Sequence, residues 1–579
     1  MNYKAVCLTV VFIGLSLSSN VYPADLNGYT AQYECRAGNA NCNVDVVTYT
    51  TAACAQTITT ADSEETIESK LNTGSSPICV TNGDYTGKGI INITASGTSG
   101  AYRAMRYTRA SDNDDEPWNQ SGANQATFRK IQIAGNFWIV HRLRVDANGG
   151  EGFIVNGNDN ILSRVEAFDG GDNILVESTG TNTLQNFYSH NATLAPGNDS
   201  NGVALGGGGS PRLVNCEVKD IPSHGIYTWG GTSVENAVIE NCDVYTSTAM
   251  YTDCNGNLTP GNPESPCAAS EAALSLKSAT LSTNPTKVIH NRWWGTRSTD
   301  TDICCIDGSG GQIISLSDEG VRESTYVLFQ NNIVMDGPVG IQHPHSTGQG
   351  ADNHHNSIIG NIVYKIKNYQ TPGNGQTMEF IQGRLEEAYL NTFIAAEKWG
   401  GFGTKDSDWR CNVFIDTGTR ADTAGSNTQV DFNVFYGVTA YTTGSTNVSK
   451  TLNTRANSTA YSLDDVIRTT GTPPADGTAG DFLYKVVSAG TSASSPPTYC
   501  VKLNCVVTDG TVKLKAIRGP YKFFRKLRTV AAGEATYIPY ARAVNLSVLP
   551  EFGLCLDTFA SRAGVGINNV DNIGSDDRL

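Results

Sequence analysis

The stretch "RLVNCEVKD", residues 212–220, returns 26 residues later as "VIENCDVYT", residues 238–246. In each copy, apolar residues surround a central asparagine, and similar segments recur between residues 138 and 437. Aligned on that central position, the segments place one row of residues along the chain: Arg142, Ser163, Asn186, Asn215, Asn241, Asn291, Asn331, Asn361, Asn391, Asn412 and Asn433.

The spacings along this row are 21, 23, 29, 26, 50, 40, 30, 30, 21 and 21 residues. A floor near 21 with longer steps is typical of a coil of short strands in which some turns carry long loops. Helical solenoids need longer units with a 3.6-residue period, which this chain lacks. A β-propeller needs regular four-strand blades of about 40 residues. The repeat therefore predicts an all-β fold, a right-handed parallel β-helix.

In such a fold, strands of neighbouring coils lie about 4.8 Å apart, and alternate side chains fill the interior. An inward asparagine at a tight turn can hydrogen-bond the coils above and below it, which forms a ladder. The 60 glycines of the chain suit the turns that this architecture needs.

The chain divides by composition into five expected segments. They are a signal peptide at 1–24, a cysteine-containing amino-terminal cap at 25–75, the parallel β-helix at 76–458, a small β-rich module at 459–520 and a closing segment at 521–579. Within the cap, Ile67 and Leu71 share one face of a short amphipathic helix, which we expect to cover the first coil.

The first residues are typical of an export signal. Lys4 precedes the short apolar stretch 5–17, and a cleavage site follows Ala24. Without Cys7, fourteen of the fifteen cysteines remain, an even number that suits an oxidising compartment. We therefore expect a secreted or periplasmic protein with disulfides. Zinc binding is a weaker alternative, because no CxxC pair is repeated at finger spacing.

Local cysteine pairs are candidate loop disulfides, although spacing alone does not fix the connectivity. The pairs are Cys35 with Cys42, Cys254 with Cys267, and Cys500 with Cys505. The net charge of −15 argues against a nucleic-acid partner, whose phosphates attract a basic surface. It suits an extracellular calcium-binding protein, and equally an ordinary secreted chain. No later stretch approaches the apolar length of a membrane span.

Residues 61–108 combine the capping helix with "GDYTGKGIINITASGTSG". This segment resembles the beginning of secreted β-helical polysaccharide lyases of the chondroitinase B and alginate lyase type, which belong to the pectin lyase-like fold. The resemblance implies a β-helix that acts on an acidic polysaccharide. Residues 461–520, with "AGTS" and "TDGT" turns, resemble a small β module found in phage tail and secreted carbohydrate-active proteins. A structural insertion and a binding module both fit that segment.

The segment "EAALSLKS" leads to the candidate catalytic residues. Strand alternation turns Leu274 and Leu276 inward and Lys277 outward. The "LKS" resembles the site of the base lysine in chondroitinase B-like lyases, which implies Lys277 as base and Arg297 and Arg292 as its cationic partners. Arg297 follows Lys277 by 20 residues, close to one coil, so the two should stack. The alternative is a set of solvated surface charges.

The remaining candidates are metal ligands and substrate-binding residues. The lyase resemblance implies a calcium ion, for which Glu271, Asp199 and Asp220 are candidate ligands. Loop aspartates in glycine-rich turns are the structural alternative. We predict contacts between the polysaccharide and Trp293, Trp294, His343 and His345, although core packing and loop positions explain these residues as well.

The sequence thus predicts an exported β-helical protein that acts on an acidic polysaccharide, as a calcium-assisted lyase working by β-elimination. The alternative is a non-catalytic adhesin or glycan-binding β-helix. Convergence of Lys277, Arg297 and a metal-binding carboxylate in one groove would separate them.

Overall fold

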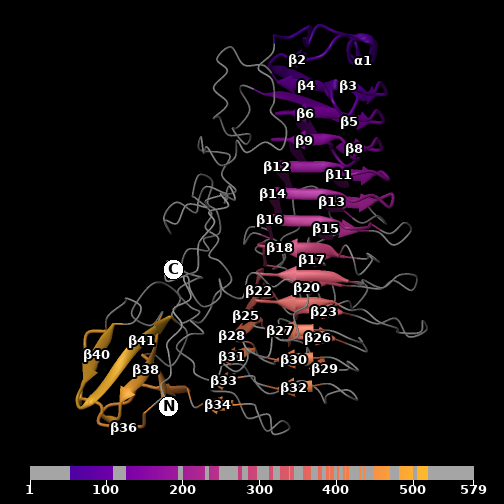
Figure 1. Cartoon of the computed structure of the whole chain (residues 1–579). Helices are drawn as coiled ribbons and strands as arrows, with labels where there is room; N and C mark the ends of the chain where they lie inside the picture. The colour runs from indigo at the N-terminus through magenta and orange to yellow at the C-terminus, as the bar shows by residue number, and fades with distance from the viewer. Residues whose placement is uncertain are drawn as a thin grey trace, which may run out of the picture.

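The computed structural model is a tall stack of short parallel strands with a separate small sheet beside its last coils (Figure 1). It describes residues 53–107, 125–193, 200–228, 234–246, 272–276, 285–295, 312–316, 326–337, 339–343, 356–366, 376–380, 387–389, 391–394, 396, 401–402, 408–410, 412–415, 429–431, 434–436, 448–450, 452–463, 465–469, 482–499 and 505–518.

The stack has three sides, and each side is a ladder of parallel strands. Side one contains β1 (Gln56–Ile58), β2 (Ile78–Val80), β4 (Arg103–Tyr107), β6 (Trp138–His141), β9 (Ile161–Ser163), the first halves of β12 (Thr183–His190), β14 (Arg212–Lys219) and β16 (Val238–Tyr245), then β18 (Thr286–Ile289), β21 (Val327–Gln330), β24 (Ser357–Ile359), β27 (Glu387–Tyr389), β30 (Asp408–Arg410) and β32 (Gln429–Asp431).

Side two contains the first parts of β3 (Gly83–Ile93) and β5 (Ala126–Ile133), β7 (Arg144–Asp146), β10 (Glu166–Phe168), the second halves of β12, β14 and β16, then β19 (Arg292–Trp294), β22 (Ile333–Gly337), β25 (Ile362–Ile366), β28 (Thr392–Ile394), β31 (Val413–Ile415), β33 (Val434–Tyr436) and β34 (Val448–Lys450).

Side three contains the last parts of β3 and β5, then β8 (Phe153–Val155), β11 (Asp172–Glu177), β13 (Asn201–Gly206), β15 (His224–Thr228), β17 (Ala272–Ser275), β20 (Gln312–Ser315), β23 (Val339–His343), β26 (Gln376–Phe380) and β29 (Gly401–Phe402). The predicted parallel β-helix is confirmed.

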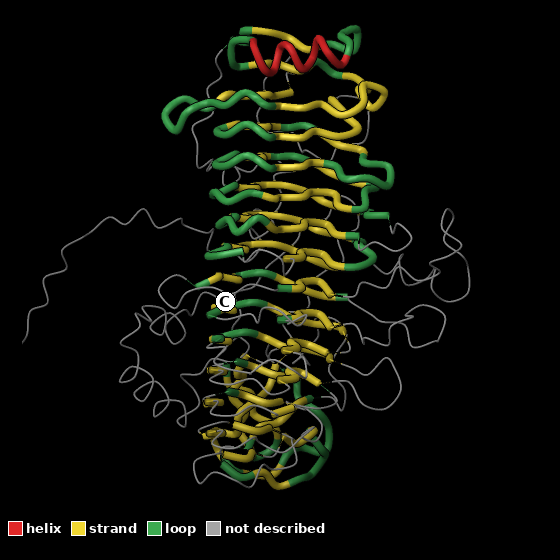
Figure 2. The backbone as a smooth tube through the Cα atoms, turned by 90° about the vertical axis from the view of Figure 1, so that its right-hand side faces the viewer, coloured by secondary structure: helices red, strands yellow, loops and turns green. Residues whose placement is uncertain are grey.

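The helix α1 (Glu64–Thr73) covers the first coil, as Figure 2 shows. Ser63 caps it, since its hydroxyl accepts a hydrogen bond from the Thr66 amide at 3.3 Å. Ile67 and Leu71 are fully buried, as the amphipathic pattern predicts. A disulfide between Cys54 and Cys79 joins the cap segment to β2. No helix in the described ranges has the length and apolar character that crossing a bilayer requires.

Sides one and two meet at a bend of one residue with positive φ. On successive coils that residue is Arg142, Arg164, Asn186, Asn215, Asn241, His290, Asn331 and then Gly360, with φ between 54° and 67°. Asparagine and glycine suit this left-handed conformation. The bend therefore explains half of the asparagine repeat.

The residue after the bend points into the helix, and this inner row explains the other half. It contains Leu143, Val165, Phe187, Cys216, Cys242, Asn291, Asn332, Asn361, Asn391 and Asn412. The backbone N–H of each asparagine donates to the side-chain Oδ1 of the next member. The distances are 2.9 Å from Asn291 to Asn332, 2.8 Å from Asn332 to Asn361, and 2.9 Å from Asn361 to Asn391 and from Asn391 to Asn412.

The predicted ladder is thus confirmed, with its register corrected. The sequence alignment mixed the bend position with the inner position, because asparagine is suited to both. Ser163 lies one residue before its bend, and Asn331 is a bend residue whose neighbour Asn332 belongs to the ladder.

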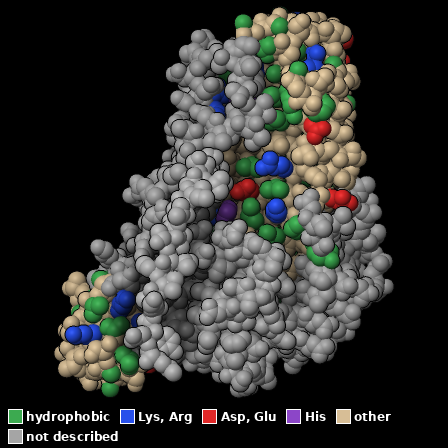
Figure 3. Space-filling view, in the orientation of Figure 1, with side chains coloured by type: hydrophobic (Ala, Val, Ile, Leu, Met, Phe, Trp, Pro, Cys, Tyr) green, Lys and Arg blue, Asp and Glu red, His purple; other side chains and the backbone are tan. Residues whose placement is uncertain are grey.

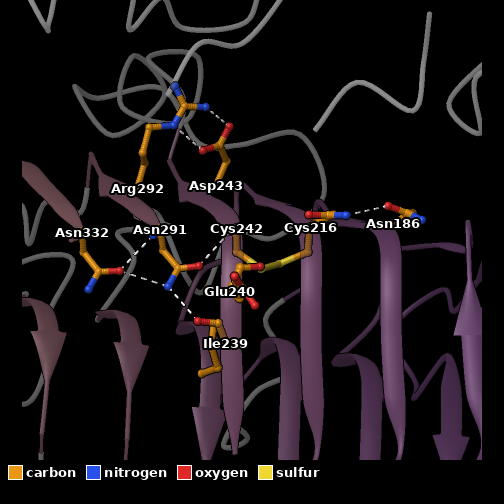
Figure 4. The surroundings of a disulfide bond; sticks show 10 residues. Asn186, Cys216, Ile239, Glu240, Cys242, Asp243, Asn291, Arg292 and Asn332 are labelled. Atoms are coloured by element: carbon orange, nitrogen blue, oxygen red, sulfur yellow. Dashed lines mark hydrogen bonds and ion pairs between the residues drawn. A yellow bond between two sulfur atoms is a disulfide. The ribbon is translucent and has the colours of Figure 1, made fainter. Parts of the chain in front are cut away.

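A disulfide continues the inner row upward from the ladder. Cys216 and Cys242 lie opposite each other on β14 and β16, with Cα atoms 4.4 Å apart. The Cys242 amide donates to Asn291 Oδ1 at 2.8 Å, so the ladder begins where the disulfide ends (Figure 4). Cys505 is also disulfide-bonded. The other predicted cysteine partners lie outside the described residues.

The small sheet forms a module with its own core. Its strand order is β35 (Leu452–Thr454), β37 (Val466–Arg468), β38 (Phe482–Ser488), β41 (Val512–Arg518) and β40 (Val506–Asp509), and β36 (Ala460–Tyr461) pairs with β39 (Gly490–Thr491). Buried Arg455 holds buried Asp509 through two hydrogen bonds of 2.9 and 3.0 Å. This bidentate pair ties β40 to the chain before β36.

Candidate functional site

The outer surface of side two carries charged and aromatic side chains over six successive coils. Because strand residues alternate, β7, β10, β12, β14, β16 and β19 each place two residues outward in register. We call this set the polar strip: Arg144, Asp146, Glu166, Phe168, Tyr188, His190, Glu217, Lys219, Asp243, Tyr245, Arg292 and Trp294. Figure 3 shows side chains of both charges and a histidine together near the middle of the stack.

Glu166 organises the partly exposed end of the strip. Its carboxylate accepts hydrogen bonds from Arg144 Nε at 2.6 Å and Nη2 at 3.2 Å, and it lies 3.0 Å from His190 Nε2. Since a carboxylate only accepts, Nε2 of His190 donates, and Nδ1 is left as the basic nitrogen. The His190 ring stacks on Tyr188 and Phe168, with centroid distances of 4.1 and 5.3 Å. The imidazole is therefore fixed in tautomer and in orientation.

Lys219 lies directly opposite His190 on the next coil. The Lys219 side chain is 26% exposed, and its ammonium lies 3.6 Å from the Asp220 carboxylate. Two coils before Lys219, directly after β10, burial and then the negative charge of Asp146 raise the pKa of Asp169. This end of the strip thus places a histidine, a lysine and carboxylates within three successive coils.

The other end of the strip is buried and internally paired. Tyr245 donates to Glu217 Oε1 at 2.8 Å and stacks on Trp294 with centroids 4.3 Å apart. Arg292 is fully buried, and its guanidinium forms an ion pair with Asp243, with Nε 2.5 Å from Oδ1. Figure 4 shows this pair on the outside of the strands. The predicted catalytic Arg292 therefore neutralises a neighbouring carboxylate.

A cationic corner adjoins the strip where sides one and two meet. We use this name for Arg106, Arg142 and Arg164, which surround His141. Arg106 faces His141 across the β4–β6 ladder, and the other two arginines are bend residues of successive coils. Burial, then the charges of Arg142, Arg164 and Arg106, hold the pKa of His141 well below its usual range. His141 is neutral near pH 7, so the corner carries three positive charges.

The two predicted substrate-binding tryptophans have opposite orientations. Trp293 points into the helix and is fully buried in its core, which removes it from contact with a polymer. Trp294 belongs to the outer surface and is 6% exposed. The difference follows from strand alternation within β19.

Several predicted site residues lie outside the described residues. They are Lys277, Arg297, Glu271, Asp199 and His345. His343 ends β23, but its side chain is not described. Leu274 and Leu276 are buried as predicted, and Ala273 and Ser275, which precede each of them, are buried as well. The row of Lys277 and Arg297 stays a prediction.

The predicted calcium ligands find no support in the described part of the chain. Within those ranges, no three His, Cys, Asp or Glu side chains are grouped so that they could hold a metal ion. Asp220, the predicted ligand that is described, lies beside Lys219. Glu166 and His190, in contrast, were missed, although both lie in repeat segments. Strand alternation alone predicts that both side chains point outward. Their contact across neighbouring coils could not be predicted, because it depends on the lengths of the loops between the strands.

Comparison with known proteins supports the fold. A family model described as "Right handed beta helix region" matches residues 129–262, which confirms the predicted hand of the coil. A search of curated proteins returned no match to this sequence.

Three solved structures illustrate the likeness. A mannuronic acid specific polysaccharide family 6 lyase from human gut microbiota is 14% identical, with a TM-score of 0.39, over 68% of this chain and 81% of that one. Pectate lyase Pel9A is 13% identical, with a TM-score of 0.31, over 80% and 94%. The Streptococcus pneumoniae adhesin PfbA is 10% identical, with a TM-score of 0.33, over 67% and 94%. Likeness at this level says nothing about reaction or ligand.

Proposed function

We propose that the protein is an exported enzyme that binds an acidic polysaccharide along side two and cleaves it by β-elimination. The observation that carries this proposal is the histidine held by Glu166 on side two, the side that begins at the bend arginines of the cationic corner. Arginines suit the carboxylates of a uronate polymer, because a guanidinium binds a carboxylate through two parallel hydrogen bonds. The disulfides support export.

The chemistry assigns distinct tasks to the described residues. An arginine of the corner neutralises the uronate carboxylate, which lowers the barrier to removal of the C5 proton. His190 Nδ1 accepts that proton, the C4–C5 double bond forms, and the bond between C4 and the glycosidic oxygen breaks. Lys219, opposite His190, donates a proton to the departing oxygen. Glu166 acts through His190 and is a positioning residue.

Lys277 is the competing base from the sequence, with Arg297 as its partner. Calcium assistance is likewise a proposal, which needs ligands such as Glu271 and Asp199 outside the described ranges. No step above depends on calcium. Addition of a chelator to the same assay tests for it.

The test is the ultraviolet absorbance of the unsaturated uronate product on alginate, pectate and glycosaminoglycans. We expect a rise on one of these polymers that falls about 100-fold or more in His190→Asn. A loss in Lys277→Ala with full activity in His190→Asn would move the base to the sequence-derived site. A flat trace on every polymer, with folded protein, would refute the lyase assignment.

A non-catalytic glycan-binding protein is the second candidate. The observation that favours it is the mutual pairing of ionic groups along the buried end of the strip, where Arg292 and Glu217 already have partners. Binding of a polymer without product absorbance would establish this reading.

A further inference from the structure

The outward surface of the module sheet collects lysines. In β38, β41 and β40, one set of alternating residues packs into the module core, among them Tyr484, Val486 and Leu514. The opposite set contains Lys485, Lys513 and Lys515 together with Val506 and Thr508. We call these five residues the lysine face. Figure 3 shows Lys or Arg side chains interleaved with hydrophobic ones on the visible surface of this module.

The register brings like charges together. Lys485 is directly opposite Lys515, which is directly opposite Val506, and Lys513 is directly opposite Thr508. Like charges at opposed positions destabilise a sheet. The Lys513 residue is exposed, and no hydrogen bond or ion pair joins the side chain of Lys513 or Lys515 to another described residue. The lysine face therefore concentrates positive charge locally, in a chain whose net charge is −15.

The two acidic side chains in the described part of the module, Asp509 and Asp465, offset this charge only in part. Asp509 is on the core side and is bound by Arg455. Asp465 accepts a hydrogen bond from the Ser462 amide at 2.7 Å. Val506 is 53% exposed on the lysine face itself, and Val487 of β38 is 38% exposed. The surface thus combines point charges with apolar contact area.

We propose that the lysine face is an accessory binding surface for an anionic polysaccharide, which holds the polymer while side two acts on it. This inference rests on the proposed function for the identity of the polymer. Charge complementarity selects the occupant: ammonium groups attract carboxylates or sulfates along a chain, and the exposed valines contact the apolar faces of sugar rings. The attraction is of the kind that salt screens.

The test uses the full-length chain and affinity electrophoresis in gels that contain pectate, alginate or heparin. The variant is Lys485→Gln/Lys513→Gln/Lys515→Gln. A matched control, Lys88→Gln/Lys130→Gln/Lys287→Gln, removes the same charge from the β-helix. Loss of three surface cations predicts an affinity that is roughly tenfold lower in the module variant and little changed in the control. A neutral galactan gel should retard none of the proteins.

Outcomes separate this inference from the proposed function. Cleavage of short oligosaccharides should be unchanged in the module variant, while its affinity for the polymer falls. Absence of cleavage with a preserved affinity difference would refute the lyase and leave the lysine face standing. Equal affinity of variant and control would overturn the inference. So would concentration-dependent self-association at low salt that the module variant abolishes without an effect on polymer binding, since the occupant would then be a second copy.

Discussion

The early and the late coils solve the same packing problem with opposite chemistry. Up to β16, the inner row after the bend is apolar or disulfide-bonded, and the outer surface of side two carries the polar strip. From β22 onward, the inner row is asparagine, and outer positions carry buried Ile333, Met335 and Ile362. The change occurs at the coil of β18 and β19, where Asn291 begins the ladder and Arg292 ends the strip. Polar groups are thus tolerated inside when every partner is satisfied.

Among the variants that test this comparison, Glu166→Gln should have the largest effect. It changes the carboxylate that holds His190 on the outer surface of the early coils. We expect activity to fall about 100-fold, since the amide no longer holds His190 through a charge. The loss should appear in kcat with KM little changed, which a merely structural role would not produce. Glu240→Gln is the control, because Glu240 faces His290 at 3.8 Å on side one, away from the strip. Equal losses in both variants would reject the assignment.

Removal of the Cys216–Cys242 disulfide should come next. The double variant Cys216→Ala/Cys242→Ala frees a loop of 26 residues and should lower the free energy of unfolding by about 3 kcal/mol. Denaturant unfolding under oxidising conditions measures it. If unchanged stability were found, the apolar packing of the inner row would be sufficient by itself.

Exchange of the two inner-row chemistries sharpens the comparison. Asn361→Leu leaves the Asn332 amide and the Phe329 carbonyl without their bonds of 2.8 and 2.9 Å. The free energy of unfolding should fall by about 2 kcal/mol, the penalty of unsatisfied buried groups. Leu143→Asn is the converse variant, and thermal unfolding compares the two. A neutral Asn361→Leu would mean that the ladder contributes nothing beyond shape.

The smallest effect is expected at Asp169, where the pKa is raised by burial and by Asp146. The unfolded state ionises more readily than the folded state, so ionisation of Asp169 lowers stability as pH rises above 3.8. Asp169→Asn should raise the free energy of unfolding by a few tenths of a kcal/mol at neutral pH. This gain should vanish below pH 3.8. A gain that persists in acid would point to the left-handed backbone at this position instead of the charge.

The repeat predicted the fold because backbone geometry repeats on every coil, whatever the loops contain. It missed the bend register by one residue at Ser163, Asn291 and Asn361. At the two asparagines the reason is that asparagine suits both the left-handed bend and the ladder. The site was less predictable. Glu166 lies 22 residues after Arg144 and 24 before His190, and Arg292 follows Asp243 by 49. Such pairings depend on loop lengths that no local pattern encodes.

The asparagine ladder holds successive coils at a constant spacing, whatever the number of residues in the chain between its members. Its consecutive members are separated by 41, 29, 30 and 21 residues, yet the hydrogen bonds from each backbone N–H to the next Oδ1 stay between 2.8 and 2.9 Å. The pitch of the scaffold is therefore decoupled from the size of what is inserted between rungs. Loops of this protein can lengthen, shorten or be exchanged for foreign sequences, and the surface they decorate will keep its spacing. This freedom recommends the late coils as positions for grafting recognition loops.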